Sequence, residues 1–101
     1  MKKYFKVKTQ LNVEIRTTKE YWDYLVTKKH RVMNGKDKVV IETLKNTDEI
    51  KRSKIDENIF LYYKQHDRLY CVVAKYAGKD GFFITAYLTD KVKEGETTWT
   101  K

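Results

Sequence analysis

The sequence predicts an α+β protein in which two N-terminal helices pack on one face of a four-stranded antiparallel sheet, with or without an extra N-terminal strand or hairpin. Three alternating runs, rich in β-branched and aromatic residues, predict the main strands: Ile59–Lys64, Arg68–Val73 and Phe82–Tyr87. Short polar turns separate these runs and indicate an antiparallel meander. Two stretches with helical periodicity precede the meander, and this segregation of helices from strands is typical of the α+β class.

The N-terminal third begins with two short alternating segments, residues 4–7 and 11–15, which fit a hairpin, an edge strand or an extended arm. Thr17 and Glu20 then have the spacing of a capping box, with Thr17 as the N-cap. The helix that follows carries an apolar stripe at spacings of three and four, made of Trp22, Leu25, Val26, Val32 and Met33. Asn34-Gly35 is expected to end this helix.

A second helix over residues 36–45 and a polar strand over residues 49–55 complete the expected elements. Along the last strand of the meander, an aliphatic row predicts the core face: Phe82, Ile84, Ala86 and Leu88. The opposite row, with Thr85 and Tyr87, then belongs to an open face that is solvated or occupied by a ligand. We expect Trp99 to pack back on the body of the protein, because a free tail would expose a large apolar ring.

Length and composition limit the class of protein. A chain of 101 residues fits a single domain, residues 1–101. No apolar run could span a bilayer, and the N-terminus lacks the apolar segment of a signal peptide, so we expect no membrane contact and a cytoplasmic location. Cys71 is the only cysteine, which excludes an internal disulfide and a cysteine-based zinc site. The net charge of +8 favours a polyanionic partner, although lysine-rich surfaces also keep small proteins soluble.

The open face of the predicted sheet carries the residue types of a single-stranded nucleic acid site. Aromatic rings stack on bases and cations hold phosphates, so Tyr87, Lys64 and Lys75 are candidates to bind such a substrate. Tyr62 and Tyr63 are adjacent, and the alternation leaves open which of the two faces the site. The competing interpretation is that cross-strand tyrosines only stabilise a half-exposed sheet.

The same residues permit metal-free cleavage of RNA. This reaction needs a base for the 2′-OH proton, an acid for the departing 5′-oxygen and cations for the phosphorane charge. His30 is the natural acid–base group, and Arg52 with Lys51 are the natural phosphate clamps. Ser53, Thr85 and a tyrosine can orient the phosphate. We expect no cofactor and no metal, because no group of residues has metal-ligand spacing.

The histidines also have ordinary structural interpretations. A single helical histidine such as His30 is more often a satisfied residue at the edge of the core than a catalytic group. His66 lies in a predicted turn, where we expect its ring to be in water.

A series of short motifs, in a fixed order, extends over nearly the whole chain from residue 4 to Trp99. The series includes Thr18-Lys19-Glu20-Tyr21-Trp22, Lys29-His30, Glu42-Thr43-Leu44, Asp48-Glu49-Ile50, Arg52-Ser53, Leu61-Tyr62-Tyr63, Cys71-Val72-Val73-Ala74-Lys75, Gly81-Phe82-Phe83-Ile84-Thr85-Ala86-Tyr87 and Thr89-Asp90-Lys91. In order and spacing it resembles the phage-associated barnase–EndoU–colicin–RelE-like (BECR) nuclease group, toxin-like proteins of bacteria and cyanobacteria.

The resemblance implies an α+β fold and a metal-independent endoribonuclease of toxin type. Such an enzyme cleaves RNA through attack of the 2′-OH, which leaves 2′,3′-cyclic phosphate ends, and it is often paired with a small acidic antitoxin protein. Position by position, the matching site residues are His30, Arg52-Ser53, Tyr62-Tyr63 and Thr85.

The chain departs from the pattern of the group at three positions. Arg31 and Thr47 stand where proline is common, and Lys51 stands where the group has arginine. Without proline, the first helix is expected to continue through His30. Two other functions fit the same composition: a non-catalytic basic RNA-binding module, or an interaction protein that binds an acidic partner.

Overall fold

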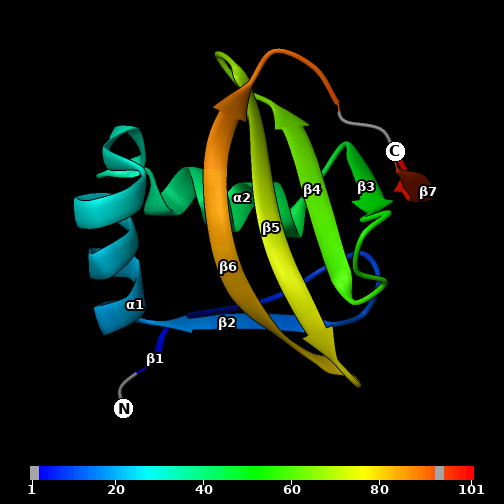
Figure 1. Ribbon diagram of the computed structural model, residues 1–101, viewed down its shortest axis with the longest axis horizontal. Coiled ribbons are helices and arrows are strands. Elements are labelled where there is room, and N and C mark those ends of the chain that lie inside the picture. Colours follow the sequence, from blue (N-terminus) through cyan, green and yellow to red (C-terminus); the bar gives the residue numbers. More distant parts are fainter. Residues whose placement is uncertain (1–2, 93–94) are drawn as a thin grey trace.

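The computed structural model of the protein describes residues 3–92 and 95–101 and contains a mixed β-sheet flanked by helical segments (Figure 1). The elements in chain order are β1 (Lys3–Lys8), β2 (Glu14–Thr18), α1 (Lys19–Tyr24), the π-helix η1 (Leu25–Lys29), the 3₁₀-helix η2 (Arg31–Met33), α2 (Asp37–Lys45), β3 (Glu49–Arg52), β4 (Ile59–Gln65), β5 (Leu69–Ala77), β6 (Asp80–Thr89) and β7 (Glu96–Thr100).

The sheet has seven strands in the order β1-β2-β6-β5-β4-β3-β7. β2 runs parallel to β6, and the other neighbouring pairs are antiparallel. The predicted fold class, a four-stranded antiparallel sheet covered by two helices, is therefore wrong. Two additions account for the difference: the β1–β2 hairpin extends the sheet beyond β6, and β7 extends it beyond β3.

The main core lies between the sheet and α2, on what we call the helix-covered face. α2 contributes Val40 and Leu44, which lie one turn apart on one side of the helix and are fully buried. The strands contribute residues that point to the same side of the sheet and are 0% exposed: Ile15, Ile50, Tyr62, Val72 and Ala86. Burial of apolar surface, at roughly 25 cal/mol per Å², is what drives the sheet and helix together.

The predicted first helix is broken into three short pieces. Thr18, not Thr17, is its N-cap, since β2 extends through Thr18 and the Tyr21 N–H donates to the Thr18 Oγ1 at 3.1 Å. After α1 the helix widens into a π-turn, in which the His30 N–H donates to the Leu25 carbonyl at 2.8 Å. His30 then leaves the helical region (φ −135°, ψ 78°), so the expected continuation through His30 is wrong.

A β-bulge in β6 changes which of its residues face the core. Val73 pairs with Thr85 and Ala74 pairs with Phe83, so Ile84 is the extra residue between them. Phe83 and Ala86 consequently share the main core, while Ile84 packs on the opposite side of the sheet and Phe82 is 43% exposed. Of the predicted core row, Ala86 and Leu88 do pack in the main core, whereas Phe82 and Ile84 do not, because strict alternation ignores the bulge.

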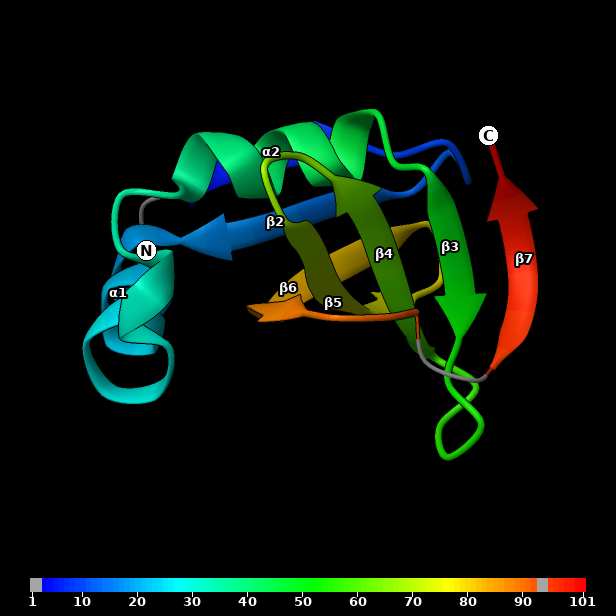
Figure 2. The ribbon, with the colours of Figure 1, turned by 90° about the horizontal axis from the view of Figure 1, so that it is seen from above.

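The opposite side of the sheet, here called the second face, has a smaller core of its own. Tyr63 and Cys71 are almost fully buried there, and Val92 packs against this group. Figure 2 shows that the chain after β6 runs along this side of the sheet, away from α2. The expectation of an open second face is therefore wrong where residues 90–92, here called the covering segment, place Val92 against Tyr63 and Cys71.

The C-terminal strand confirms that Trp99 packs on the body. Trp99 pairs with Ile50 of β3 and packs, half-buried, against the main core. In the part of the chain that the structure describes, no helix has both the length and the apolar character needed to cross a membrane.

The parallel contact between β2 and β6 depends on Gly81. A Cβ at this position would overlap the Cδ1 of Ile15 and approach the Lys75 carbonyl oxygen to 3.2 Å. We expect Gly81→Ala to lower the free energy of unfolding by about 1–3 kcal/mol, the usual cost of overpacking. Chemical denaturation would measure this change.

Ile15→Val supplies the control, because it removes the Cδ1 that the new methyl would meet. In the Ile15→Val background the additional cost of Gly81→Ala should be clearly smaller than in the parent chain. Equal costs in the two backgrounds would contradict the proposed contact.

Candidate nucleic-acid interface

His30 lies beside Tyr87 at the edge of the second face. The π-turn that ends at His30 brings its ring to 6.2 Å from the ring of Tyr87, centroid to centroid, with 33° between the planes. Both side chains are half-buried. Burial is the main cause, and a hydrogen bond with the Cys71 thiol the second, of a pKa of the Tyr87 hydroxyl above its usual value. The structure thus brings together two of the residues that the sequence selected.

Three cations surround His30 in the sequence and are exposed: Lys28, Lys29 and Arg31, here called the basic cluster. Within residues 3–92 and 95–101, none of the three forms an ion pair with a carboxylate. The Arg31 Nε donates only to the Thr27 carbonyl, at 3.3 Å. Because no carboxylate neutralises them, these cations are available to an anionic ligand.

Thr85 lies on the second face of β6, between Ile84 and Tyr87, opposite Val73 of β5. Its Oγ1 is buried, and within the described residues it has no hydrogen-bond partner. A buried hydroxyl without a partner costs about 1–3 kcal/mol. Thr85 therefore lies near His30 and Tyr87, but its hydroxyl is covered by protein.

The adjacent tyrosines point to opposite faces. Tyr63 is on the second face and 1% exposed, in register with Cys71 and, beyond it, with Tyr87. Tyr62 is fully buried in the main core, where its hydroxyl donates to the Thr9 Oγ1 at 3.0 Å and is hydrogen-bonded with Tyr76. Burial raises the pKa of Tyr62 as well. Of the two, Tyr63 is on the side of His30, under the covering segment.

Arg52 is far from His30 in the sheet. It lies on β3, with β4 and β5 between it and β6, and on the face that Ile50 and Tyr62 share. Its guanidinium donates to Glu96 at 2.6 Å, and this hydrogen bond raises the pKa of Arg52. The structure does not bring the predicted phosphate clamp to the predicted acid–base group.

Two other predicted substrate contacts, both lysines, lie elsewhere and have local partners. Lys51 is on the second face of β3 and forms an ion pair with Glu49 at 3.3 Å. Lys75 is exposed on the second face of β5, 3.7 Å from Asp56.

Ser53 organises the loop after β3. Its Oγ accepts the N–H groups of Ile55 at 3.1 Å and of Asp56 at 3.4 Å. With Arg52, this serine also lines an open recess of about 650 Å³, which has glutamates as well as cations in its wall: Arg52, Ser53, Lys54, Ile55, Glu57, Gly95 and Glu96.

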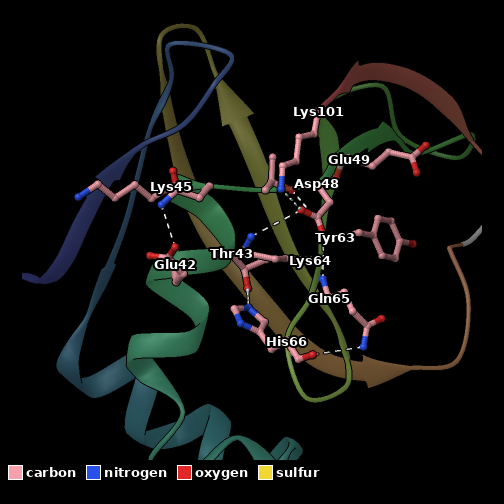
Figure 3. Close-up of polar contacts among 12 residues, drawn as sticks. Glu42, Thr43, Lys45, Asp48, Glu49, Tyr63, Lys64, Gln65, His66 and Lys101 are labelled. Carbon is pink, nitrogen blue, oxygen red and sulfur yellow. Dashed lines mark hydrogen bonds and ion pairs between the residues drawn. The ribbon is translucent and has the colours of Figure 1, made fainter.

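Lys64 belongs to a polar cluster at the end of β4 (Figure 3). Its Nζ is 3.5 Å from the Oδ1 of Asp48, and the Gln65 N–H donates to the Oδ2 of the same carboxylate at 2.9 Å. The Nζ of Lys101 lies 3.8 Å from the Oδ1 of Asp48. The hydrogen bond from Gln65 is the main reason that the pKa of Asp48 is lowered, and the two lysines add to it. Lys64 therefore ties β4 to Asp48, the residue that precedes β3.

His66 is not in water, contrary to the expectation. Its Nε2 lies 3.0 Å from the Thr43 Oγ1 (Figure 3). Its ring also packs edge-on against Tyr70. The single hydrogen of Thr43 is donated to the Val39 carbonyl at 2.7 Å, so Thr43 accepts the Nε2–H of His66. A turn placed over the last turns of α2 explains this burial, and single-sequence patterns do not reveal such a contact.

Comparisons with protein-family models, with curated proteins and with solved structures find no match. Within the described residues, no group of three or more His, Cys, Asp or Glu side chains could hold a metal ion.

The hydroxyl of Thr85 gives a direct test of its role. We expect Thr85→Val to leave the free energy of unfolding unchanged or to raise it by about 1 kcal/mol, since it removes a buried hydroxyl without a partner and keeps the shape. Thr43→Val is the matched control, because the Thr43 hydroxyl has two partners, and it should destabilise by about 1–3 kcal/mol. Equal losses in the two variants, measured by denaturation, would mean that Thr85 has a partner.

The lowered pKa of Asp48 predicts a pH-dependent contribution to stability. A carboxylate with a depressed folded-state pKa stabilises above its unfolded pKa of roughly 3.9, and this stabilisation is lost as pH falls through the folded pKa. We expect Asp48→Asn to be less stable than the parent by about 1 kcal/mol at pH 7, and the difference to shrink below about pH 4. Denaturation at several pH values would show this, with the exposed Asp67→Asn as the control for the same change of charge.

Proposed function

We propose that this protein is a cytoplasmic, metal-independent endoribonuclease of toxin type, and that RNA binds at the basic cluster and is cleaved next to His30. The observation that carries the proposal is the His30 ring beside Tyr87, flanked in the sequence by exposed cations that have no carboxylate partner in the described part of the chain. The net charge of +8 and the resemblance to BECR nucleases favour the same activity.

The chemistry assigns a role to each part of this site. Lys28, Lys29 and Arg31 neutralise the phosphates and hold the strand. His30 removes the proton from a 2′-OH, whose oxygen then attacks the adjacent phosphorus and forms the 2′,3′-cyclic phosphate. The bond to the 5′-oxygen breaks, and the protonated imidazole returns its proton to that oxygen, so no net proton is consumed. Tyr87, neutral and beside the ring, limits the rotation of His30.

The basic cluster also suits the expected partner. An acidic antitoxin that covers Lys28, Lys29 and Arg31 would compete with RNA for the same cations, and so would inhibit by charge complementarity.

A non-catalytic RNA-binding module is the second candidate, and a specific observation favours it. Arg52 lies on the other face of the sheet and is paired with Glu96, and Tyr63 is buried beneath the covering segment. Without these two groups the site has fewer means to stabilise the transition state. This candidate predicts salt-sensitive RNA binding without cleavage.

A cleavage assay separates the two candidates. We expect the purified protein to cleave a 5′-labelled single-stranded RNA in EDTA and to leave a 2′,3′-cyclic phosphate. His30→Ala should lower the rate by about 100-fold or more, the usual contribution of general acid–base catalysis, with little change in RNA affinity. Cleavage that requires a divalent metal, or that survives in His30→Ala, would overturn the mechanism, and binding without cleavage would favour the second candidate.

Charge controls complete the design. The triple variant Lys28→Ala/Lys29→Ala/Arg31→Ala should raise KM and flatten the dependence of affinity on salt. A triple variant with the same change of net charge, Lys38→Ala/Lys45→Ala/Lys79→Ala, removes exposed lysines elsewhere. It should have a smaller effect. Arg52→Ala decides whether this arginine contributes across the sheet, because a loss equal to that of His30→Ala would restore its predicted role.

A further inference from the structure

A recess opens on the second face where β6 meets β2 and α1. It has a volume of about 420 Å³ and a largely apolar lining: Arg16, Thr17, Thr18, Tyr21, Phe82, Phe83 and Ile84. We call it the aromatic recess. Neither the sequence analysis nor the proposed cleavage site uses it.

Two of the lining rings are exposed to solvent and fixed in place. Tyr21 is 37% exposed, its hydroxyl donates to the Ile84 carbonyl at 2.6 Å, and its ring meets Phe83 edge-on at 6.2 Å. Phe82 is 43% exposed, with the guanidinium carbon of Arg16 4.7 Å above its ring. Arg16 is held in turn by Asp80 at 3.6 Å. Rings that are already ordered lose little entropy when a ligand stacks on them.

The aromatic recess and His30, which is next to the basic cluster in the sequence, both lie along the second face of β6. Phe82, Ile84 and Tyr87 are all on the second face of β6, and His30 is beside Tyr87. Tyr87 is three positions after Ile84 along the strand, and this spacing corresponds to a distance of about 10 Å. A single extended strand could therefore contact both places at once.

We propose that the aromatic recess binds an unstacked base of the single-stranded RNA whose phosphates contact the basic cluster. The inference rests on the proposed function, because it assigns a base-binding subsite to the same substrate. A planar π-surface fits a lining of aromatic rings and a guanidinium, and stacking of this kind is how proteins hold single-stranded nucleic acids. An acidic peptide fits less well, because the one cation of the recess, Arg16, is already paired with Asp80.

Binding of a fluorescent single-stranded oligouridylate, followed by anisotropy at several salt concentrations, tests the proposal. The probe is 2′-O-methylated, because it then lacks the 2′-OH that the proposed cleavage needs. Phe82→Leu removes the exposed ring and keeps an apolar side chain, so we expect affinity to fall by about 5- to 100-fold, the effect of losing one base–aromatic stack. The slope of log affinity against log salt should not change, because the phosphate contacts are intact. Phe82→Tyr should restore the affinity.

Ile55→Ala is the control: it shortens a 98% exposed apolar side chain that lies outside the recess, and it should bind like the parent. A series of oligonucleotides, each with one abasic site at a different position, locates the base that the recess binds. For the parent protein, the oligonucleotide that lacks this base should bind less tightly than the intact strand. In Phe82→Leu this penalty should be absent. Circular dichroism of each variant verifies the fold.

The outcomes distinguish the two proposals. If the parent protein binds no RNA, the proposed function fails and the base-binding site fails with it. If the parent binds RNA and Phe82→Leu binds equally well, only the base-binding site is overturned. If binding of a labelled Glu-Glu-Trp-Glu-Glu peptide depends on Phe82 and binding of the oligouridylate does not, the recess belongs to a protein partner. This result would also overturn the base-binding site.

Discussion

The parallel pairing of β2 with β6 is the contact on which the rest of the structure depends. Residues 14–16 lie in register with residues 80–82, and this short ladder joins the N-terminal hairpin to the β3–β6 meander. The close approach needs the bare backbone of Gly81 against Ile15. Since α1 starts where β2 ends, the same ladder determines that the helical run passes along β6. The places of Tyr21 and His30 beside that strand both follow from it.

The chain has eight tyrosines, and several of them serve to fill the core and not to bind a ligand. Tyr62 and Tyr70 are buried on the helix-covered face and Tyr63 on the second face, so the interpretation that cross-strand tyrosines stabilise the sheet is correct for these three. Tyr62 also needs a polar partner inside the core, which Thr9 supplies. The exposed aromatic side chains Tyr21 and Phe82 lie instead where α1 and β2 meet β6, in the aromatic recess.

Local patterns predicted the strands well and their arrangement poorly. The runs around residues 59–64, 68–73 and 82–87 do form β4, β5 and β6, because alternation is a property of neighbours in sequence. Which strand pairs with β6 is decided by contacts between distant residues, and a periodicity of two carries no information about it. The bulge at Ile84 and the π-turn before His30 each shift the register by one residue, and no local signal marks them.

For the candidate site too, residue types could be predicted from the sequence better than their arrangement in space. His30 and Tyr87 were selected by residue type and do lie together. The position of Arg52 could have been anticipated, since Ile50 is the apolar residue of its strand and must face the core, and residues two apart point to the same side. The aromatic recess could not, because it is formed by three elements that only the tertiary fold brings together.

The β2–β6 ladder also has a consequence for how the chain folds. The meander from β3 to β6 is built from neighbours in sequence, so its loops are short and their closure entropy is small. Docking of the hairpin joins residues near opposite ends of the chain, and it must close a loop that contains both helices and three strands. We therefore expect the meander to order first and the hairpin to add late in folding, as the step that completes the core.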